Sequence, residues 1–366
     1  MQALILAGGE GTRLRPLTST IAKPVVPLAG RPFISYMLDW LCGHGVHEVI
    51  LACGFLAHSV RAILGDGAAH GVQLSYLEEP RPLGTGGAVK FAEDLLDERF
   101  LVLNGDVLTD IDLSAQLRAH EQTGAELTLA LYPVDDSSAY GVVCCAPDGA
   151  VLEFVEKPEA GNSGAGLINA GAYVMQRTVL ETMGPALTNI SIEREVFPGL
   201  IEHGLYGFES SGYWLDIGTP ERYLQATYDI LEGNVDTAVG RQMGDSRSII
   251  GAEVKLDGCL VDPVLVDDGC EIADGAVIGA RTVLGRGVLI GQGAQVEGSV
   301  LLDGASVGPL STIISSIVGP DVEIGERCQL ERAVLGQGAA VGSDTALEPG
   351  ARIFPGVRLP EGAIQT

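Results

Sequence analysis

Residues 277–296 read VIGARTVLGRGVLIGQGAQV, a stretch in which Ile278-Gly279, Leu284-Gly285 and Ile290-Gly291 follow one another at intervals of six residues. A hexapeptide repeat of this kind predicts a parallel β-helix, because each six-residue side supplies one aliphatic side chain to the interior and small residues make the corners. The same spacing extends in both directions, through Ile272, Ile278, Leu284, Ile290, Val296, Val318, Ile324, Leu330, Leu335, Val341, Leu347, Ile353 and Leu359.

The repeat has two interruptions and a clear beginning. Its register slips between Val296 and Val318 and again after Leu330, and we expect short loops to leave the coil at these places. The period first appears after about residue 245. We therefore predict a first domain over 1–232, a linker over 233–247 and a β-helix domain over 248–366.

The first domain alternates short apolar runs with helical patterns. The predicted strands are Ala3–Leu6, Val49–Cys53, Val72–Leu77, Phe100–Leu103 and Leu127–Tyr132, and the predicted helices are Pro32–Leu41, Gly87–Leu96 and Leu113–Gln122. This alternation predicts an α/β fold, a Rossmann-like and mostly parallel sheet with helices on both faces. Ligands on such sheets bind outside the carboxyl ends of the strands, so motifs that follow strands carry the functional information.

Composition narrows the class of protein. The chain has 366 residues and a formal net charge of −26, which argues against a nucleic acid or an anionic membrane surface as partner. It has no run of 18 apolar residues, and its N-terminus lacks the basic region of a signal peptide. The seven cysteines show neither metal-ligand nor disulfide spacing. We expect a cytoplasmic protein with reduced thiols.

A glycine-rich segment follows the first predicted strand. Ala7-Gly8-Gly9-Glu10-Gly11-Thr12-Arg13 lets backbone N–H groups approach a phosphate chain closely, although it lacks the Gly-Lys-Ser/Thr ending of a P-loop. Arg13 lies inside it, and Lys23, one of only four lysines, follows ten residues later. In so acidic a chain a triphosphate needs such local positive charge. Taken singly, each residue could be an ordinary surface charge.

The order Gly8-Gly9-x-Gly11-Thr12-Arg13-Leu14 and then Lys23-Pro24 resembles the opening motif of the nucleotidyltransferases that make nucleotide sugars. The resemblance covers residues 1 to about 230 and, with a left-handed β-helix, essentially the whole chain. It implies an enzyme that joins a nucleoside triphosphate to a sugar 1-phosphate with Mg²⁺ and releases pyrophosphate. It also implies that Arg13 and Lys23 are catalytic. The implied nucleotide-binding residues of this segment are Leu6, Ala7, Gly8, Gly9, Gly11 and Thr12.

Two aspartates are candidates to hold the metal. Asp106 follows the predicted strand Phe100–Leu103, and Asp216 lies in Tyr213-Trp214-Leu215-Asp216-Ile217-Gly218. Magnesium takes hard oxygen ligands, often one or two carboxylates with substrate phosphates completing the shell. In the family, the residues that match Asp106 and Asp216 bind this metal and are catalytic. The alternative for an aspartate after a strand is a turn or helix cap, which we accept for the nearby Asp110 and Asp112.

The segment from Glu78 to Gly87 matches the family's base-recognition loop. The implied nucleotide-binding residues are Glu79, Pro82, Gly84 and Thr85. A carboxylate only accepts hydrogen bonds, whereas guanine offers two donors on its Watson–Crick edge and thymine offers one between two acceptors. Glu79, or its neighbour Glu78, therefore favours guanine and hence GTP.

Further motifs match the sugar side of the family site. The implied sugar-phosphate-binding residues are Tyr140, Gly141, Glu156, Lys157, Asn169 and Trp214. A Glu-Lys pair is otherwise a common solvated strand end. The segments Ser191–Pro198 and Trp214–Pro220 resemble those of guanylyltransferases that act on mannose 1-phosphate, and the choice of mannose rests on this resemblance alone.

The predicted β-helix domain contains none of the six histidines, which argues against a histidine-dependent acyltransferase site there. We expect instead that it mediates assembly into a homo-oligomer. Two alternatives to a guanylyltransferase stay open at this point. One is a thymidylyl- or uridylyltransferase that acts on glucose 1-phosphate, and the other is a catalytically silent regulatory subunit that binds nucleotide sugars.

Overall fold

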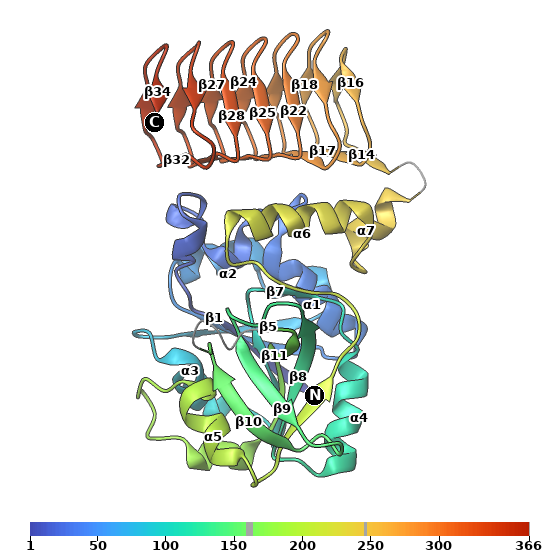
Figure 1. Ribbon diagram of the computed structural model, residues 1–366, viewed down its shortest axis with the longest axis vertical. Helices are drawn as coiled ribbons and strands as arrows, with labels where there is room; N and C mark the ends of the chain where they lie inside the picture. Colours follow the sequence, from blue (N-terminus) through green and yellow to red (C-terminus); the bar gives the residue numbers. More distant parts are fainter. Residues whose placement is uncertain (159–163, 245–246, 366) are drawn as a thin grey trace. The chain divides into compact units, whose positions relative to one another are not determined.

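The computed structural model describes residues 1–158, 164–244 and 247–365, and the chain divides into two compact units (Figure 1). Unit 1 comprises Met1–Gly9 and Ile34–Trp214, and unit 2 comprises Glu10–Phe33 and Leu215–Thr366. The chain therefore passes from one unit to the other three times. Two of these passages lie within motifs that the sequence marks as functional, the glycine-rich segment and the Tyr213–Gly218 segment.

Unit 1 is built on a mixed sheet with the strand order β10-β9-β11-β6-β1-β4-β5. Its parallel half consists of β1 (Gln2–Ala7), β4 (Glu48–Cys53), β5 (Gln73–Glu78) and β6 (Arg99–Asn104). The other half consists of β8 (Leu127–Val134), β9 (Gly141–Cys145), β10 (Val151–Glu156), β11 (Gly166–Gln176) and β12 (Leu205–Glu209). Here β11 runs antiparallel to β6, β8 and β9. Strands β8, β9, β10 and β11 follow one another along the chain with no helix among the described residues between them, and antiparallel neighbours need no crossover helix. The five predicted strands are confirmed, and the predicted parallel character holds for one half of the sheet.

Helices cover both faces of this sheet, as predicted. Leu4 and Val102 share one buried cluster with Val89 of α3 (Gly84–Phe91) and Phe197 of α5 (Phe197–Leu200). Alternation along the strands sends their equally buried neighbours to the opposite face. On that face Gln116 of α4 (Leu113–Thr123) donates to two backbone carbonyls of the sheet. The remaining helices of the unit are α1 (Phe33–Gly43) and α2 (Ala57–Leu64).

Unit 2 contains the β-helix, which consists of three parallel sheets of seven short strands each. The first sheet comprises β14 (Ser248–Ile250), β17 (Val264–Val266), β20 (Thr282–Leu284), β23 (Val300–Leu301), β26 (Ile317–Val318), β29 (Val334–Leu335) and β32 (Arg352–Ile353). The second comprises β15 (Lys255–Leu256), β18 (Glu271–Ile272), β21 (Leu289–Ile290), β24 (Ser306–Val307), β27 (Glu323–Ile324), β30 (Ala340–Val341) and β33 (Arg358–Leu359). The third comprises β16 (Cys259–Leu260), β19 (Val277–Ile278), β22 (Gln295–Glu297), β25 (Thr312–Ile314), β28 (Gln329–Glu331), β31 (Ala346–Leu347) and β34 (Ile364–Gln365). The repeat residues form its continuous apolar interior, which confirms the predicted fold class.

The register slips have a different cause from the one predicted, because the coils continue through both places without a loop. Val264 pairs with Thr282, whereas Val283 pairs with Val300, so that the central coils are one residue shorter than the first. Small residues occupy the shortened corner. The backbone N–H of Ser316 donates to the Ser299 hydroxyl at 3.0 Å, and that of Ala333 donates to the Ser316 hydroxyl at 3.0 Å. The serine hydroxyls thereby accept hydrogen bonds from buried backbone N–H groups at the shortened corner.

The rest of unit 2 packs along the β-helix. Helices α6 (Pro220–Glu232) and α7 (Ala238–Met243) precede the β-helix in the chain and run along the sheet that contains β14 to β32 (Figure 1). The Tyr228 hydroxyl of α6 donates to the Gly298 carbonyl at 2.5 Å. The short strands β2 (Pro27–Leu28) and β3 (Arg31–Pro32) belong to this unit, and the Tyr223 hydroxyl donates to the Pro27 carbonyl. The predicted linker 233–247 carries α7, and its residues 245–246 lie outside the described part.

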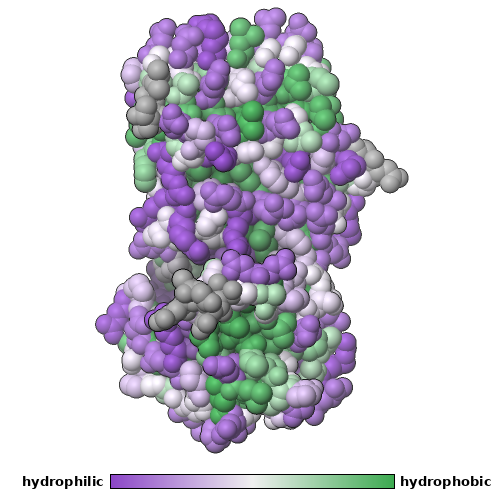
Figure 2. Space-filling model, in the orientation of Figure 1, coloured by the Kyte–Doolittle hydropathy of each residue, from purple (hydrophilic) through white to green (hydrophobic). Residues whose placement is uncertain are grey.

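Strand β10 forms one edge of the antiparallel half of unit 1. Its Leu152 and Val155 side chains are 60% and 38% exposed, and Figure 2 shows an apolar area in the region of β9 and β10. Within the described ranges, none of the helices has the length and hydropathy needed to cross a bilayer.

Candidate active site

The glycine-rich segment begins where β1 ends, beside the loop that carries Asp106. Leu6 pairs with Asn104 of β6, and the Gly105 N–H donates to the Leu6 carbonyl at 2.9 Å. A Cβ atom on Gly105 would come within 2.8 Å of that carbonyl oxygen, so a glycine is needed for this approach. The parallel strands thus bring Asp106 to the same edge of the sheet as Leu6, Ala7, Gly8 and Gly9.

Glu79 lies directly against the glycine-rich segment. A Cβ atom on Gly8 would come within 2.7 Å of the Glu79 Oε1 atom. The other carboxylate oxygen, Oε2, accepts the Leu83 N–H at 3.1 Å. Burial raises the pKa of Glu79, and the hydrogen bond from Leu83 opposes part of that increase. The carboxylate is therefore oriented between the end of β1 and the start of α3.

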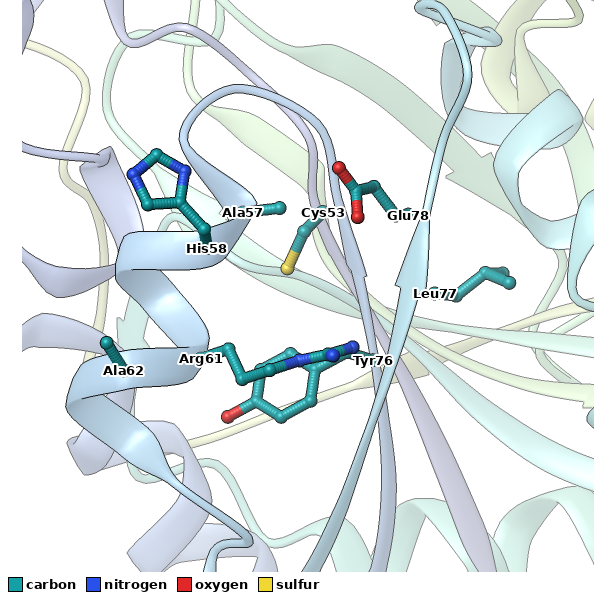
Figure 3. A pocket seen from close by; sticks show the side chains of 8 residues that line it. All are labelled: Cys53, Ala57, His58, Arg61, Ala62, Tyr76, Leu77 and Glu78. Atoms are coloured by element: carbon teal, nitrogen blue, oxygen red, sulfur yellow. The ribbon is translucent and has the colours of Figure 1, made fainter.

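The neighbouring Glu78 faces a different space. It lines a hollow at the carboxyl ends of β4 and β5, together with Cys53, Arg61 and Tyr76 (Figure 3). The Arg61 guanidinium covers the Tyr76 ring at 4.9 Å from the ring centre. Successive residues of an extended chain point to opposite sides, so only Glu79 is directed at the glycine-rich segment. The structure thereby favours Glu79 over Glu78 as the residue that meets a ligand there.

The remaining residues of the predicted base loop are tied to the segment around Ile190. Gly84 has a φ of +71°, and a Cβ atom there would come within 2.6 Å of the Ile190 carbonyl oxygen. The Thr85 hydroxyl donates to Glu193 Oε2 at 2.8 Å and accepts the Ile192 N–H at 2.9 Å. The Asn189 side chain donates to the Pro82 carbonyl at 3.4 Å. The base loop and the Ser191–Pro198 segment are thus one hydrogen-bonded body.

Three packed aromatic rings lie among the residues predicted to bind the sugar phosphate. Trp214 is buried, its Nε1 atom donates to the Ala170 carbonyl at 2.8 Å, and its ring lies 5.3 Å from the Tyr140 ring and 5.7 Å from the Tyr132 ring. Edge-to-face and stacked contacts of this kind fix ring positions. Tyr140 is therefore held by packing at the start of β9.

Gly141 and Glu156 are neighbours across β9 and β10. They pair directly, and a Cβ atom on Gly141 would come within 2.8 Å of Glu156 Oε2. Burial, with the nearby Glu193 carboxylate, raises the pKa of Glu156, and Lys157 opposes this. The Lys157 ammonium lies 3.8 Å from the Glu156 carboxylate and is largely exposed. A partly buried carboxylate and an accessible ammonium suit the hydroxyl groups and the phosphate of a sugar phosphate respectively.

Asn169 completes this group from β11. Its Nδ2 atom donates to the Tyr173 hydroxyl at 2.9 Å, and its Oδ1 atom accepts the Gly171 N–H at 3.1 Å. Gly171 has a φ of +74°, and a Cβ atom there would come within 2.6 Å of Asn104. These contacts fix the Asn169 amide near the end of β6.

Unit 2 holds the second part of the glycine-rich segment. Gly11 has a φ of +63°, and its carbonyl accepts the Thr18 hydroxyl at 2.7 Å and the Leu14 N–H at 2.9 Å. A Cβ atom on Gly11 would lie 3.2 Å from the Lys23 side chain. The turn that contains Thr12 is thus closed on itself, with Lys23 packed beside it.

Arg13 and Asp216 have partners that the sequence did not reveal. The Arg13 guanidinium lies across Gly218, where a Cβ atom would come within 2.6 Å of Arg13 Nη2. Arg222 of α6 donates to the Asp216 carboxylate from the next turn of chain. Both contacts are made within unit 2, so the segment from Asp216 to Arg222 restrains the Arg13 guanidinium and the Asp216 carboxylate. Side-chain types in the sequence gave no signal for either partner.

The predicted site residues form two groups. Unit 1 contains Leu6, Ala7, Gly8, Gly9, Glu79, Pro82, Gly84, Thr85, Asp106, Tyr140, Gly141, Glu156, Lys157, Asn169 and Trp214. Unit 2 contains Gly11, Thr12, Arg13, Lys23 and Asp216. Sequence reasoning missed the residues that hold these groups in place, namely Glu193, Gly218 and Arg222.

Comparison with known proteins gives the family. A family model described as Nucleotidyl transferase matches residues 2–233, and one described as GMPPB C-terminal domain matches residues 260–362. The chain belongs to the nucleotidyl transferase family. Enzymes of this family generally use a divalent metal.

Individual relatives agree with this membership. The chain is 39% identical to a protein named mannose-1-phosphate guanylyltransferase from Mycobacterium tuberculosis, over 100% of this chain and 97% of that protein. It is also 39% identical to the mannose-1-phosphate guanyltransferase of Debaryomyces hansenii, over 87% and 86% of the two chains. Among solved structures, HddC from Yersinia pseudotuberculosis complexed with GMP-PN is 31% identical, with a TM-score of 0.54 over 62% of this chain and 97% of that one.

We predict that Gly218→Ala slows nucleotidyl transfer by roughly 10- to 100-fold without a loss of thermal stability. The new methyl group displaces the flexible end of Arg13 while the backbone stays in place. The control is Gly43→Ala, where a Cβ atom meets nothing within 4 Å. Steady-state kinetics and thermal unfolding of both variants check this, and equal turnover in the two would contradict it.

Proposed function

We propose that this nucleotidyltransferase transfers a guanylyl group from GTP to mannose 1-phosphate, forming GDP-mannose and pyrophosphate. The observation that carries the proposal is the Glu79 carboxylate, oriented by Leu83 against Gly8 at the edge of the sheet. The proteins named mannose-1-phosphate guanylyltransferase that match the chain over most of its length support the same substrate pair.

Base selection follows from the hydrogen-bonding capacity of Glu79. An ionised carboxylate offers about four acceptor positions and no donor, so it keeps acceptor capacity after binding the Leu83 N–H. Guanine presents N1–H and an exocyclic amine side by side, and both can donate to one carboxylate. Uracil and thymine place carbonyl oxygens beside their single donor, and these oxygens would be repelled.

The glycine-rich segment and two cations, Arg13 and Lys23, would bind the triphosphate. Backbone N–H groups of Gly8, Gly9 and Gly11 approach the triphosphate, while Arg13 and Lys23 neutralise its charge. The sugar-phosphate oxygen attacks the α-phosphorus in line, the new P–O bond forms and pyrophosphate leaves. This transfer needs no covalent enzyme intermediate.

Asp106 and Asp216 would hold the metal, which we propose is Mg²⁺. Both supply hard oxygen ligands, and Arg222 restrains the Asp216 carboxylate. The remaining ligands would come from substrate phosphates, as is common for magnesium. When bound, the ion would neutralise charge on the phosphates during the transfer.

Residues of the antiparallel half of unit 1 would bind the sugar phosphate. Lys157 binds its phosphate, and Glu156 and Asn169 accept from or donate to ring hydroxyl groups. Gly141 leaves room beside the Glu156 carboxylate, and the packed rings of Tyr140 and Trp214 form an apolar wall. Ground-state contacts of this kind are needed to place the attacking oxygen.

The wider organisation is also part of the proposal. Residues 1–232 would form the catalytic domain, 233–247 the connection and 248–366 a β-helix domain through which the chain forms a homo-oligomer. Exposed apolar side chains on the β-helix, among them Leu289, Leu310 and Phe354, support an assembly role. We propose a cytoplasmic location, in keeping with seven cysteines that are all free.

The substrate pair is tested by pyrophosphate release with Mg²⁺, using GTP, dTTP, UTP, ATP and CTP against mannose, glucose and N-acetylglucosamine 1-phosphates. We predict that GTP with mannose 1-phosphate gives the highest kcat/KM. A higher value for dTTP or UTP with glucose 1-phosphate would keep the enzyme class and overturn the base argument. No release from folded protein in any pair would indicate a regulatory subunit.

Asp106→Asn and Asp216→Asn are each expected to lower kcat by at least about 100-fold while thermal unfolding stays near that of the wild type. Each change keeps the side-chain shape and removes a charged metal ligand. The matched control is Asp94→Asn, which removes one exposed carboxylate outside the proposed site. Near-normal turnover in both variants would rule out the metal assignment.

The pH dependence of base selection tests Glu79. Burial raises its pKa above the ordinary value of 4.5, and only the ionised form accepts both guanine donors. We therefore expect the ratio of kcat/KM for GTP to that for UTP to fall as the pH drops through this raised pKa. Glu79→Gln should lower the ratio at neutral pH and remove its pH dependence. Parallel profiles for the two proteins would exclude Glu79 as the base reader.

A further inference from the structure

A residue near the end of the β-helix reaches the phosphate loop, defined here as Gly11–Pro16. Arg352 lies on β32, and its neighbour Ile353 points into the β-helix interior. The Arg352 Nη1 atom donates to the Arg13 carbonyl at 3.1 Å and to the Arg15 carbonyl at 2.8 Å. All of these residues belong to unit 2, although more than 330 residues of chain separate them.

The phosphate loop is fastened on its other side by apolar packing. Leu14, between the two carbonyls that Arg352 binds, is 1% exposed. It lines a small cavity with Val26, Phe33, Ile217 and other residues of unit 2. The loop backbone is therefore held between a buried leucine and an arginine from a distant coil.

These contacts restrict the conformation of Arg13. Its carbonyl accepts from Arg352 and its guanidinium lies across Gly218. Two contacts on one residue restrict both ends of it. Loss of the first would free the backbone of Arg13 while leaving the Gly218 surface unchanged.

We propose that Arg352 is a positioning residue for nucleotidyl transfer, which fixes the phosphate-loop backbone so that Arg13 meets the triphosphate. The β-helix then contributes directly to catalysis, in addition to any role in assembly. This inference rests on the proposed function of Arg13. Misplacement of a catalytic group by about 1 Å can cost roughly 100-fold in rate, even when the altered residue lies away from the chemistry.

The local charges suit this role. Glu221, at the first turn of α6, has a pKa lowered mainly by hydrogen bonds from the Thr219 side chain and from its own backbone, with a smaller contribution from the Arg352 charge. Arg352 thus donates to loop carbonyls and also acts electrostatically on a carboxylate of the same unit. In a chain with a net charge of −26, a further cation beside Arg13 also favours a bound triphosphate.

The test compares Arg352→Ala, Arg352→Lys and Arg358→Ala in the full-length protein. Arg358 lies on β33 of the last coil, its side chain is 72% exposed, and it forms a 3.7 Å ion pair with Glu323. Its removal therefore deletes an equal charge at a residue away from the Arg352 contacts. One lysine nitrogen can make both hydrogen bonds that Nη1 makes, so Arg352→Lys should restore function. Two readouts are used: steady-state kinetics with GTP and mannose 1-phosphate, and amide hydrogen exchange of the free protein.

For Arg352→Ala we expect kcat to fall about 10- to 100-fold with little change in the KM for mannose 1-phosphate. The Leu14 and Arg15 amides, which donate to the Gly11 and Thr12 carbonyls, should exchange about 10-fold faster. Arg352→Lys should recover most of both losses, and Arg358→Ala should match the wild type.

Exchange at Leu14 and Arg15 that is equal in Arg352→Ala and Arg358→Ala would overturn the proposal. Faster exchange with unchanged kcat would overturn its catalytic part. If the wild type transfers no nucleotide in any substrate pair, the proposed function fails by itself. Faster exchange in Arg352→Ala would then still show that the β-helix holds this loop.

Discussion

The chain passes between its two compact units after Gly9, after Phe33 and after Trp214, and this connectivity constrains everything else in the molecule. The first passage divides the glycine-rich segment, so that Gly8 stays with the sheet while Arg13 belongs to the unit of the β-helix. The third passage separates Trp214 from Asp216 in the same way. The glycine-rich segment and the Tyr213–Gly218 segment are therefore each shared between the two units.

The close approach of other groups to the backbone at three glycines is a second physical constraint. Gly8 faces Glu79, Gly105 faces the Leu6 carbonyl and Gly218 faces Arg13, each so closely that an added Cβ atom would displace its neighbour. These glycines leave room for the Glu79 carboxylate, for the loop that carries Asp106 and for the Arg13 guanidinium. Cationic side chains are few in this acidic chain, with 22 Lys and Arg against 48 Asp and Glu. The proposed roles of the charged groups depend on fixed positions. Hydrogen bonds from Leu83, Arg222 and Arg352 provide that restraint.

Much of this could be predicted from the sequence, because periodicity reports burial. The six-residue repeat placed Ile278, Leu284 and Ile290 in the β-helix interior, and the alternation of apolar runs located the parallel half of the sheet. The antiparallel strands were harder to find, since their residues read as ligand motifs. The shortened coils were taken for loops, because a missing residue and an inserted one disturb a repeat alike. Partners such as Arg352 could not be predicted, since no pattern relates a β-helix strand to a loop more than 330 residues away.

The proposed role of Arg352 would give the unit of the β-helix a share in the chemistry, and the central proposal is that Glu79 reads the guanine base. A crystal structure with GDP-mannose and Mg²⁺ tests this most directly. The account predicts the guanine edge on Glu79, the diphosphate against the loop of Arg13, and the mannose beside Glu156 and Asn169. A product with its base bound away from Glu79, or with its mannose bound away from Glu156 and Asn169, would contradict it.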